Sequence, residues 1–135
     1  MRIAGVNVLA VIIAAVAIYA VGALIYGVLV SPEAWMAGAG ITKEQMNAVG
    51  MTRLPYSPVM PLMTALGLAV LFKWAGVSGL GNGIKWALLV AFASAVPALL
   101  YGWVYGVGPI EHTLLDIAHL VVGHSVAGAI LASWK

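Results

Sequence analysis

The sequence predicts an all-α integral membrane protein, a bundle of four transmembrane helices with a short interfacial helical segment between the first and the second. Hydrophobic residues make up 64% of the chain and charged residues only 7%. A soluble globular domain carries about 25% charged residues because its surface must face water. The apolar residues also gather into four long stretches, and crossing a hydrocarbon core takes about 20 of them in a row. We expect one transmembrane domain over residues 1–135, with spans at about 3–30, 58–76, 84–107 and 112–134.

The first stretch, residues 3–30, contains no Asp, Glu, Lys or Arg. The apolar core of a secretory signal peptide runs about 7–15 residues, and this stretch is roughly twice as long. We therefore expect a retained span. At about 1.5 Å per residue it exceeds the bilayer thickness, so we expect it to tilt or to extend into an interface.

Residues 31–57 form the only sizeable polar region, and we expect them to lie on the membrane surface. The run Ser31-Pro32-Glu33 favours a helix start: a capping hydroxyl, proline at the first helical position, and an acid near the positive helix end. Thr42 and Gln45 have the spacing of a capping box, which predicts a second helix over about 43–49 that ends at Gly50.

Particular residues in the spans have predicted structural roles. Pro97 lies midway along the third span and is expected to kink it and to serve as a hinge. Small residues at Gly22 and in Gly102-xxx-Gly106 are expected to let helices approach closely. The predicted interfacial anchors are Trp35, Trp103 and Trp134.

The placement of Lys and Arg predicts that both termini are cytoplasmic, because cytoplasmic loops carry an excess of these residues. With that orientation, four basic residues lie inside and two lie outside. Those inside are Arg2, Lys73, Lys85 and Lys135, and those outside are Lys43 and Arg53.

The composition also excludes several classes of protein. The chain has no cysteine, so disulfides and thiolate metal sites are excluded. Its six basic residues are scattered singly and form no patch for nucleic acid. The sequence has no nucleophile elbow, zincin helix or phosphate loop. We therefore expect no enzyme activity and no cofactor.

The fourth span holds the candidate polar site. His112, Asp116 and His119 lie on one helix face, within roughly 60° of each other at 100° per residue, whereas His124 points about 100° away. An ionisable residue at membrane depth costs a few kcal/mol unless it faces protein or water. This face is therefore predicted to point into the bundle, where it is the first candidate for a functional site.

Four interpretations of this face are open. The three residues could bind a divalent metal, the histidines could ligate haem with help from a second subunit, or Asp116 and His119 could relay protons. We favour the fourth, in which Asp116 and His119 pair with each other and with neighbouring polar groups and so hold helices together. The candidate neighbours are Tyr19, Tyr26, Ser94 and Thr64.

Two patches of the sequence resemble a known family. The runs Gly22-Ala-Leu-Ile-Tyr26, Ala34-Trp35-Met36 and Gly40-Ile-Thr42-Lys-Glu44, and the closing Gly128-Ala-Ile-Leu-Ala-Ser-Trp134, are similar to the signatures of DUF1761. Its members are small bacterial membrane proteins of unknown function. The resemblance implies four spans in a bacterial inner membrane, and it implies no activity.

For function, we expect a non-enzymatic protein of the bilayer that acts through assembly, either as a homo-oligomer or as an accessory subunit of a larger membrane complex. Four short spans leave little room for a gated pathway within one protomer. The alternative is a proton-coupled small-solute transporter that works as a dimer. In that case Asp116 would be the proton site, His119 its partner, and Pro97 the hinge.

Overall fold

The computed structural model describes residues 2–134, apart from the side chains of Val49 and Met51. The chain is almost wholly helical, which confirms the predicted all-α class. Four helical stretches are long and apolar enough to cross a membrane, as predicted. They are Val8–Leu29, Leu54–Trp74, Leu80–Val104 and Ile110–Ser133.

The first span begins later than predicted, at Val8 rather than at residue 3. Before it, β1 (Arg2–Ile3) and β2 (Val6–Asn7) pair as a small antiparallel hairpin. Ala4 and Gly5 have φ of 49° and 79°, the positive values that a tight two-residue hairpin turn requires. Asn7 then caps α1 (Val8–Leu24) by accepting a hydrogen bond from the amide of Ala10 at 3.4 Å. Turn and cap together explain why the helix does not extend to residue 3.

The surface segment holds two helices, as predicted. Ser31 caps α2 (Pro32–Ala39), accepting from the amide of Ala34 at 3.1 Å, and α2 ends at Gly40 with φ of 65°. The predicted capping box of Thr42 and Gln45 starts α3 (Lys43–Arg53).

The predicted end of this second helix at Gly50 is wrong. The α3 helix passes through Gly50, whose carbonyl accepts from the amide of Leu54. A mid-helix glycine costs only about 1 kcal/mol. Pro55 ends the α-helix, because it has no N–H to donate, and a short 3₁₀ turn, η2 (Leu54–Tyr56), follows.

The remaining elements complete the later spans: α4 (Val59–Trp74), α5 (Leu80–Val90), α6 (Val96–Val104) and α7 (Ile110–Ser133). Two π-helical segments interrupt the spans, η1 (Ile25–Leu29) after α1 and η3 (Ala91–Ala95) between α5 and α6. Pro97 lies in the first turn of α6, directly after η3. A π-helical turn thus precedes this proline, and the kink and the hinge expected at Pro97 stay predictions.

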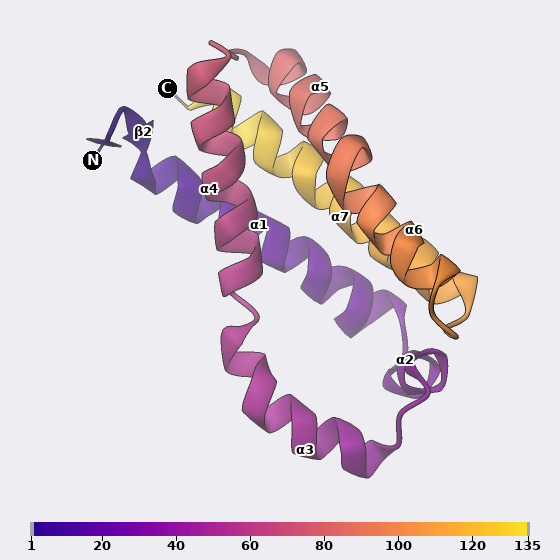
Figure 1. Cartoon of the computed structure of the whole chain (residues 1–135). Helices are drawn as coiled ribbons and strands as arrows, with labels where there is room; N and C mark the ends of the chain where they lie inside the picture. The colour runs from indigo at the N-terminus through magenta and orange to yellow at the C-terminus, as the bar shows by residue number, and fades with distance from the viewer. Residues whose placement is uncertain (1, 135) are drawn as a thin grey trace.

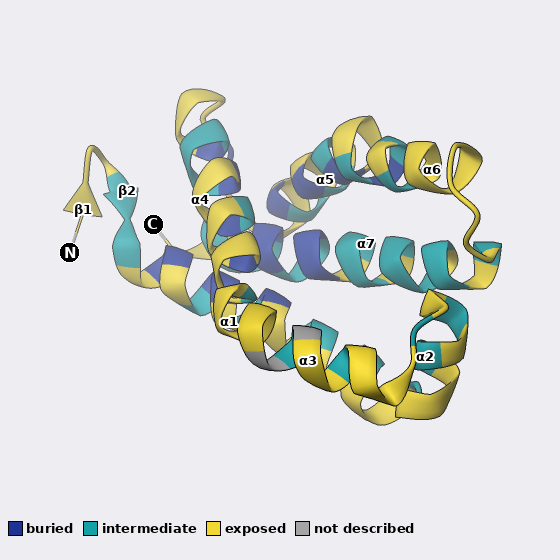
Figure 2. Ribbon diagram, turned by 60° about the horizontal axis from the view of Figure 1, so that its bottom comes forward, coloured by how far each residue is buried: buried dark blue, intermediate teal, exposed yellow. Residues whose placement is uncertain are grey.

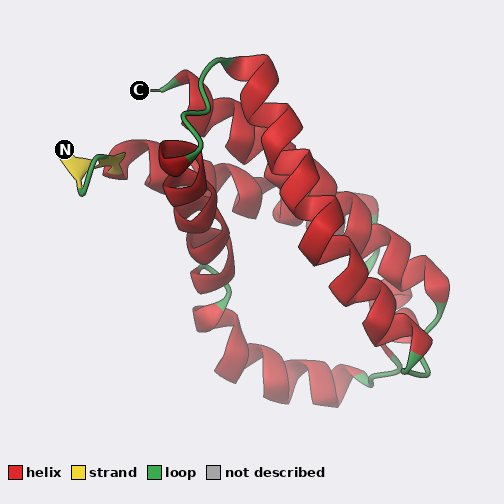
Figure 3. Ribbon diagram, turned by 45° about the horizontal axis from the view of Figure 1, so that its top comes forward, coloured by secondary structure: helices red, strands yellow, loops and turns green. Residues whose placement is uncertain are grey.

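The α7 helix is the centre of the fold. It packs against α5 and α6 on one side and against α1 on the other, and α4 crosses α1 (Figure 1). In Figure 3, α3 stands away from the other helices and returns the chain to α4. Buried residues gather in α1, α4, α5 and α7, whereas α3 is largely exposed (Figure 2).

Small residues make the closest helix contact, between α5 and α7. A Cβ on Gly83 would lie 2.2 Å from the carbonyl oxygen of Gly128, and a Cβ on Gly128 would lie 2.4 Å from that of Gly83. Both positions therefore require glycine, as is common where membrane helices touch. Gly102, which was also predicted to let helices approach closely, has open space instead, since a Cβ there would meet nothing within 4 Å.

One end of the bundle holds two basic residues. The N-terminal hairpin, the end of α7 and the α4–α5 connection gather at one end, which holds Arg2 and Lys73 (Figure 1). The α2 helix and the α6–α7 connection lie at the other. Lys135, a predicted cytoplasmic residue, lies outside the described residues.

Candidate functional site

The predicted polar face of α7 lies against α1 and α2, and its three ionisable residues are partly buried. Each of the three contacts a residue from the first third of the chain. We call this set the α7 polar cluster: Tyr26, Trp35, His112, Asp116 and His119.

Asp116 is held by Tyr26, whose hydroxyl donates a hydrogen bond to its Oδ1. Tyr26 lies in the π-helical segment η1, where the wider turn changes the direction of side chains relative to α1. Tyr26 was one of four predicted neighbours. Two of the others have partners elsewhere, since Tyr19 bonds to Ser57 at 3.2 Å and Ser94 to a carbonyl of its own span.

His119 packs against the same tyrosine. The two rings meet edge to face, with centroids 5.5 Å apart. Gly22 makes room for the imidazole, because a Cβ there would lie 3.0 Å from Nε2. This Nε2 is buried and has no hydrogen-bond partner among residues 2–134.

The predicted pairing of Asp116 with His119 is therefore wrong. Over the described part of the chain, no hydrogen bond or ion pair joins the two side chains, and both contact Tyr26 instead. The phenol of Tyr26 donates to the carboxylate and presents its ring to the imidazole, which leaves the predicted pair without direct contact.

His112 joins α2 to α7. Its Nε2 donates to the backbone carbonyl of Trp35 at 3.3 Å, and the Trp35 ring meets the imidazole edge-on at 6.0 Å. A Cβ on Gly38 would lie 2.8 Å from the imidazole, so glycine gives the ring its place. The predicted anchor Trp35 thus takes part in this contact. Trp103 and Trp134, the other two predicted anchors, are 39% and 44% exposed.

His124 lies on a different face of α7, as predicted. It is the most deeply buried of the three histidines, with only 6% of its surface exposed. Its Nδ1 donates to the carbonyl of Leu120 at 2.7 Å, so in the neutral ring Nε2 is the acceptor. It lines a groove of about 190 Å³ with residues of α4 and α5, among them Thr64 and Gly67.

The arrangement connects helices and does not gather ligands at one point. No group of three or more His, Asp or Glu side chains within residues 2–134 is placed to hold a metal ion. His112, Asp116 and His119 lie along α7, and the contacts described above join them to α1, η1 and α2.

Sequence reasoning missed the two glycines that seat the histidine rings, Gly22 and Gly38, as partners of α7. One feature of the sequence could have indicated Gly22. Gly22 and Tyr26 are four residues apart, so they share a helix face, and both belong to the runs that carry the family resemblance. Those runs also contain Trp35, so three of the resembling residues contact the histidines or Asp116 of α7.

Comparisons with known proteins agree with the resemblance. No curated protein and no solved structure matches this chain. A family model described as "Protein of unknown function (DUF1761)" matches residues 9–132, which include the whole α7 polar cluster. The predicted resemblance is confirmed, and the chain belongs to the DUF1761 family.

Proposed function

We propose that this protein is a non-enzymatic, multi-pass protein of the bacterial cytoplasmic (inner) membrane, with both termini cytoplasmic. It acts through assembly, either with itself or as an accessory subunit of a larger membrane complex. The observation that carries the proposal is a contrast. Asp116 and His112 bond to other elements of the chain, whereas the end of α6 presents two exposed tyrosines beside a glycine with open space, Tyr101, Tyr105 and Gly102.

The α7 polar cluster supports a structural role. Asp116 already accepts from Tyr26, and His112 already donates to α2. Neither the His124 groove nor a second cavity, which lies where the N-terminal hairpin meets α4 and the end of α7, is lined by Asp116 or His119. A substrate would have to displace the bonds that hold α1 and α2 on α7.

The outer face of α6 supports the assembly role. Tyr101 and Tyr105 stack in parallel at 6.1 Å and are 65% and 82% exposed. Beside them, a Cβ on Gly102 would meet no atom within 4 Å. Exposed rings beside a glycine suit close contact with another helix. Tyrosines are also common at the membrane–water interface, so the rings alone do not distinguish a helix contact from an interfacial anchor. A substitution at Gly102 does distinguish them, because a close helix contact requires a small residue there.

The test is native mass measurement after gentle detergent extraction. We expect the wild type to run as an oligomer or with a partner protein, and Gly102→Leu to reduce that species because its side chain fills the contact. Gly67→Leu is the matched control, since Gly67 also has open space but lies on α4. A wild type that is strictly monomeric and copurifies with nothing would overturn the proposal.

A second candidate, a proton-coupled small-solute transporter working as a dimer, is favoured by one observation. Within residues 2–134 the Nε2 of His119 is buried without a hydrogen-bond partner, and its ring packs against Tyr26, whose hydroxyl donates to the carboxylate of Asp116. The test is pH-driven flux of small amines into proteoliposomes, wild type against Asp116→Asn. No flux in the wild type removes this candidate, and flux that survives in the variant removes Asp116 as its proton site.

A further inference from the structure

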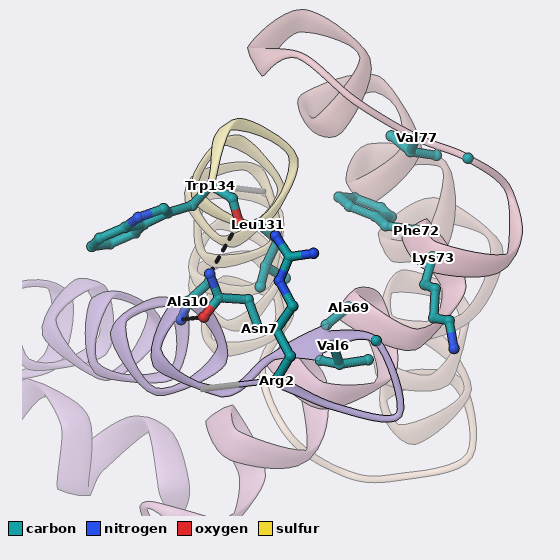
Figure 4. A pocket seen from close by; sticks show the side chains of 12 residues that line it. Arg2, Val6, Asn7, Ala10, Ala69, Phe72, Lys73, Val77, Leu131 and Trp134 are labelled. Carbon is teal, nitrogen blue, oxygen red and sulfur yellow. Dashed lines mark hydrogen bonds between the residues drawn. The ribbon is translucent and has the colours of Figure 1, made fainter.

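A cavity of about 240 Å³ lies at the end of the bundle where the N-terminal hairpin, α4 and the end of α7 meet (Figure 4). The Arg2 side chain lies between Leu131 and Trp134 of the α7 end on one side and Phe72 and Lys73 of α4 on the other. We propose that this cavity binds the phosphate headgroup of an anionic phospholipid.

The cavity is a built feature, because specific contacts hold the hairpin over it. Lys73 donates from Nζ to the carbonyl of Ala4, and the turn lies so close that a Cβ on Gly5 would be 2.9 Å from Cε of Lys73. On the other side, Asn7 donates from Nδ2 to the carbonyl of Trp134 at 3.5 Å. A hairpin with two-residue strands is not stable alone in water, so these contacts to α4 and α7 fix its position.

The charge of the lining favours an anion. Arg2 and Lys73 both line the cavity, and no Asp or Glu does. The side chain of Arg2 has no hydrogen-bond or ion-pair partner within residues 2–134. The acids of the chain lie elsewhere, in α2, in α3 and in the first half of α7: Glu33, Glu44, Glu111 and Asp116.

Phosphate fits these cations better than a carboxylate does. The guanidinium of Arg2 can make two parallel bonds to phosphate oxygens, and the ammonium of Lys73 adds a second positive charge from another element.

The walls and the location favour a lipid over free phosphate. Most of the lining is apolar and includes Val6, Phe72 and Leu131, which would contact glycerol and the first methylenes of an acyl chain. The volume lies below the roughly 300–1,000 Å³ of sites that enclose a drug-sized ligand, so it suits a headgroup. Lipid phosphates lie at the ends of membrane spans, and basic pockets between spans bind them there.

The experiment follows thermal unfolding of the purified full chain in neutral detergent, with tryptophan fluorescence as the signal. The probes are phosphatidylglycerol, phosphatidylcholine and inorganic phosphate, each titrated separately. We expect phosphatidylglycerol to raise the unfolding midpoint by a few degrees through preferential binding to the folded state. Phosphatidylcholine at the same concentration should shift it much less.

The variants test whether the effect comes from this cavity. Arg2→Gln should raise the Kd for phosphatidylglycerol about tenfold, since a hydrogen bond to a charged group is lost. Arg2→Lys should retain most of the affinity. Lys85→Gln is the matched control, because Lys85 is exposed and basic but does not line the cavity, and it should bind like the wild type.

Three results would overturn the proposal. The first is an equal loss of affinity for phosphatidylglycerol in Arg2→Gln and Lys85→Gln, because the lipid would then respond only to the net charge of the protein. The second is an equal shift from phosphatidylcholine. The third is saturation of the shift by inorganic phosphate alone, which would assign the site to a soluble phosphate. If Arg2→Gln does not fold without lipid, Arg2→Lys replaces it in the thermal titration. The Kd for phosphatidylglycerol is then also measured directly on Lys73→Gln, by native mass measurement. These two variants keep the test decisive.

Discussion

At the scale of the residue, one hydroxyl controls how a carboxylate is kept inside this fold. Asp116 lies partly buried on an apolar helix, and its hydrogen-bond donor comes from Tyr26, 90 positions earlier in the chain. Charged groups within membrane spans are costly unless paired. The Tyr26 hydroxyl therefore stabilises Asp116 and joins η1 to α7 with one bond.

Removing that hydroxyl should destabilise the fold measurably. We expect Tyr26→Phe to lower the free energy of unfolding by about 1 kcal/mol, which lies between the average of about 0.6 and the maximum of about 1.7 kcal/mol measured for hydrogen bonds between membrane helices. The measurement is equilibrium unfolding in mixed micelles with increasing SDS. Tyr101→Phe is the control, because its hydroxyl lies on the exposed face of α6. Equal losses in the two variants would contradict a specific Tyr26–Asp116 bond, and a double-mutant cycle with Asp116→Ala, which removes the acceptor, gives its coupling energy.

At the scale of the element, the sequence predicts the starts of the two surface helices, α2 and α3, better than the end of α3. Ser31 and Thr42 cap helices as expected, because a cap depends on residues three positions apart. Gly50 does not end α3, because glycine permits a left-handed turn without requiring one. The π-helical segments η1 and η3 could not be predicted, since apolar residues on all sides of a span leave no pattern that distinguishes hydrogen-bond registers.

Two of the three glycines in the surface segment, Gly40 and Gly50, should respond oppositely to alanine. Gly50 has ordinary helical geometry, with the nearest neighbour of a new Cβ at 3.6 Å, so Gly50→Ala should stabilise α3 by about 0.5–1 kcal/mol. Gly40 has φ of 65°, and Gly40→Ala should cost about 1–2 kcal/mol at the end of α2. Amide hydrogen exchange of α2 and α3 reports both changes. Slower exchange in Gly40→Ala, or faster exchange in Gly50→Ala, would show that these helix ends are assigned wrongly.

The contact between α5 and α7 gives the strongest packing prediction. Gly83→Ala would place a methyl group against backbone of α7, which cannot move aside as a side chain can, so the two helices must separate. Overpacking of this kind costs about 1–3 kcal/mol or more. We expect a large drop in the thermal unfolding midpoint. Gly67→Ala, with open space around it, should change the midpoint little. A mild effect at Gly83 would mean that α5 and α7 are farther apart than described.

At the scale of the whole molecule, the number of spans followed from composition, but their packing did not. Long apolar stretches identify spans because the bilayer fixes their length. Which spans touch depends on small residues such as Gly83 and Gly128, and glycines with the same appearance, such as Gly102, face outward. The polar face of α7 was predictable from its spacing, whereas its partners on η1 and α2 required the three-dimensional fold.

The orientation in the membrane is a prediction for the molecule as a whole, and the lack of cysteine in the chain makes it simple to test. Four basic residues against two favour cytoplasmic termini, so the α4–α5 connection should lie inside and α3 outside. Ser78 and Asn47 are exposed positions in those two places. In intact spheroplasts, a membrane-impermeant maleimide should label Asn47→Cys at once and Ser78→Cys only after lysis. Labelling of Ser78→Cys alone would reverse the orientation. Partial labelling of both would mean that the chain inserts in two directions, and Lys85→Gln, which lowers the inside count to three, should then increase the reversed fraction.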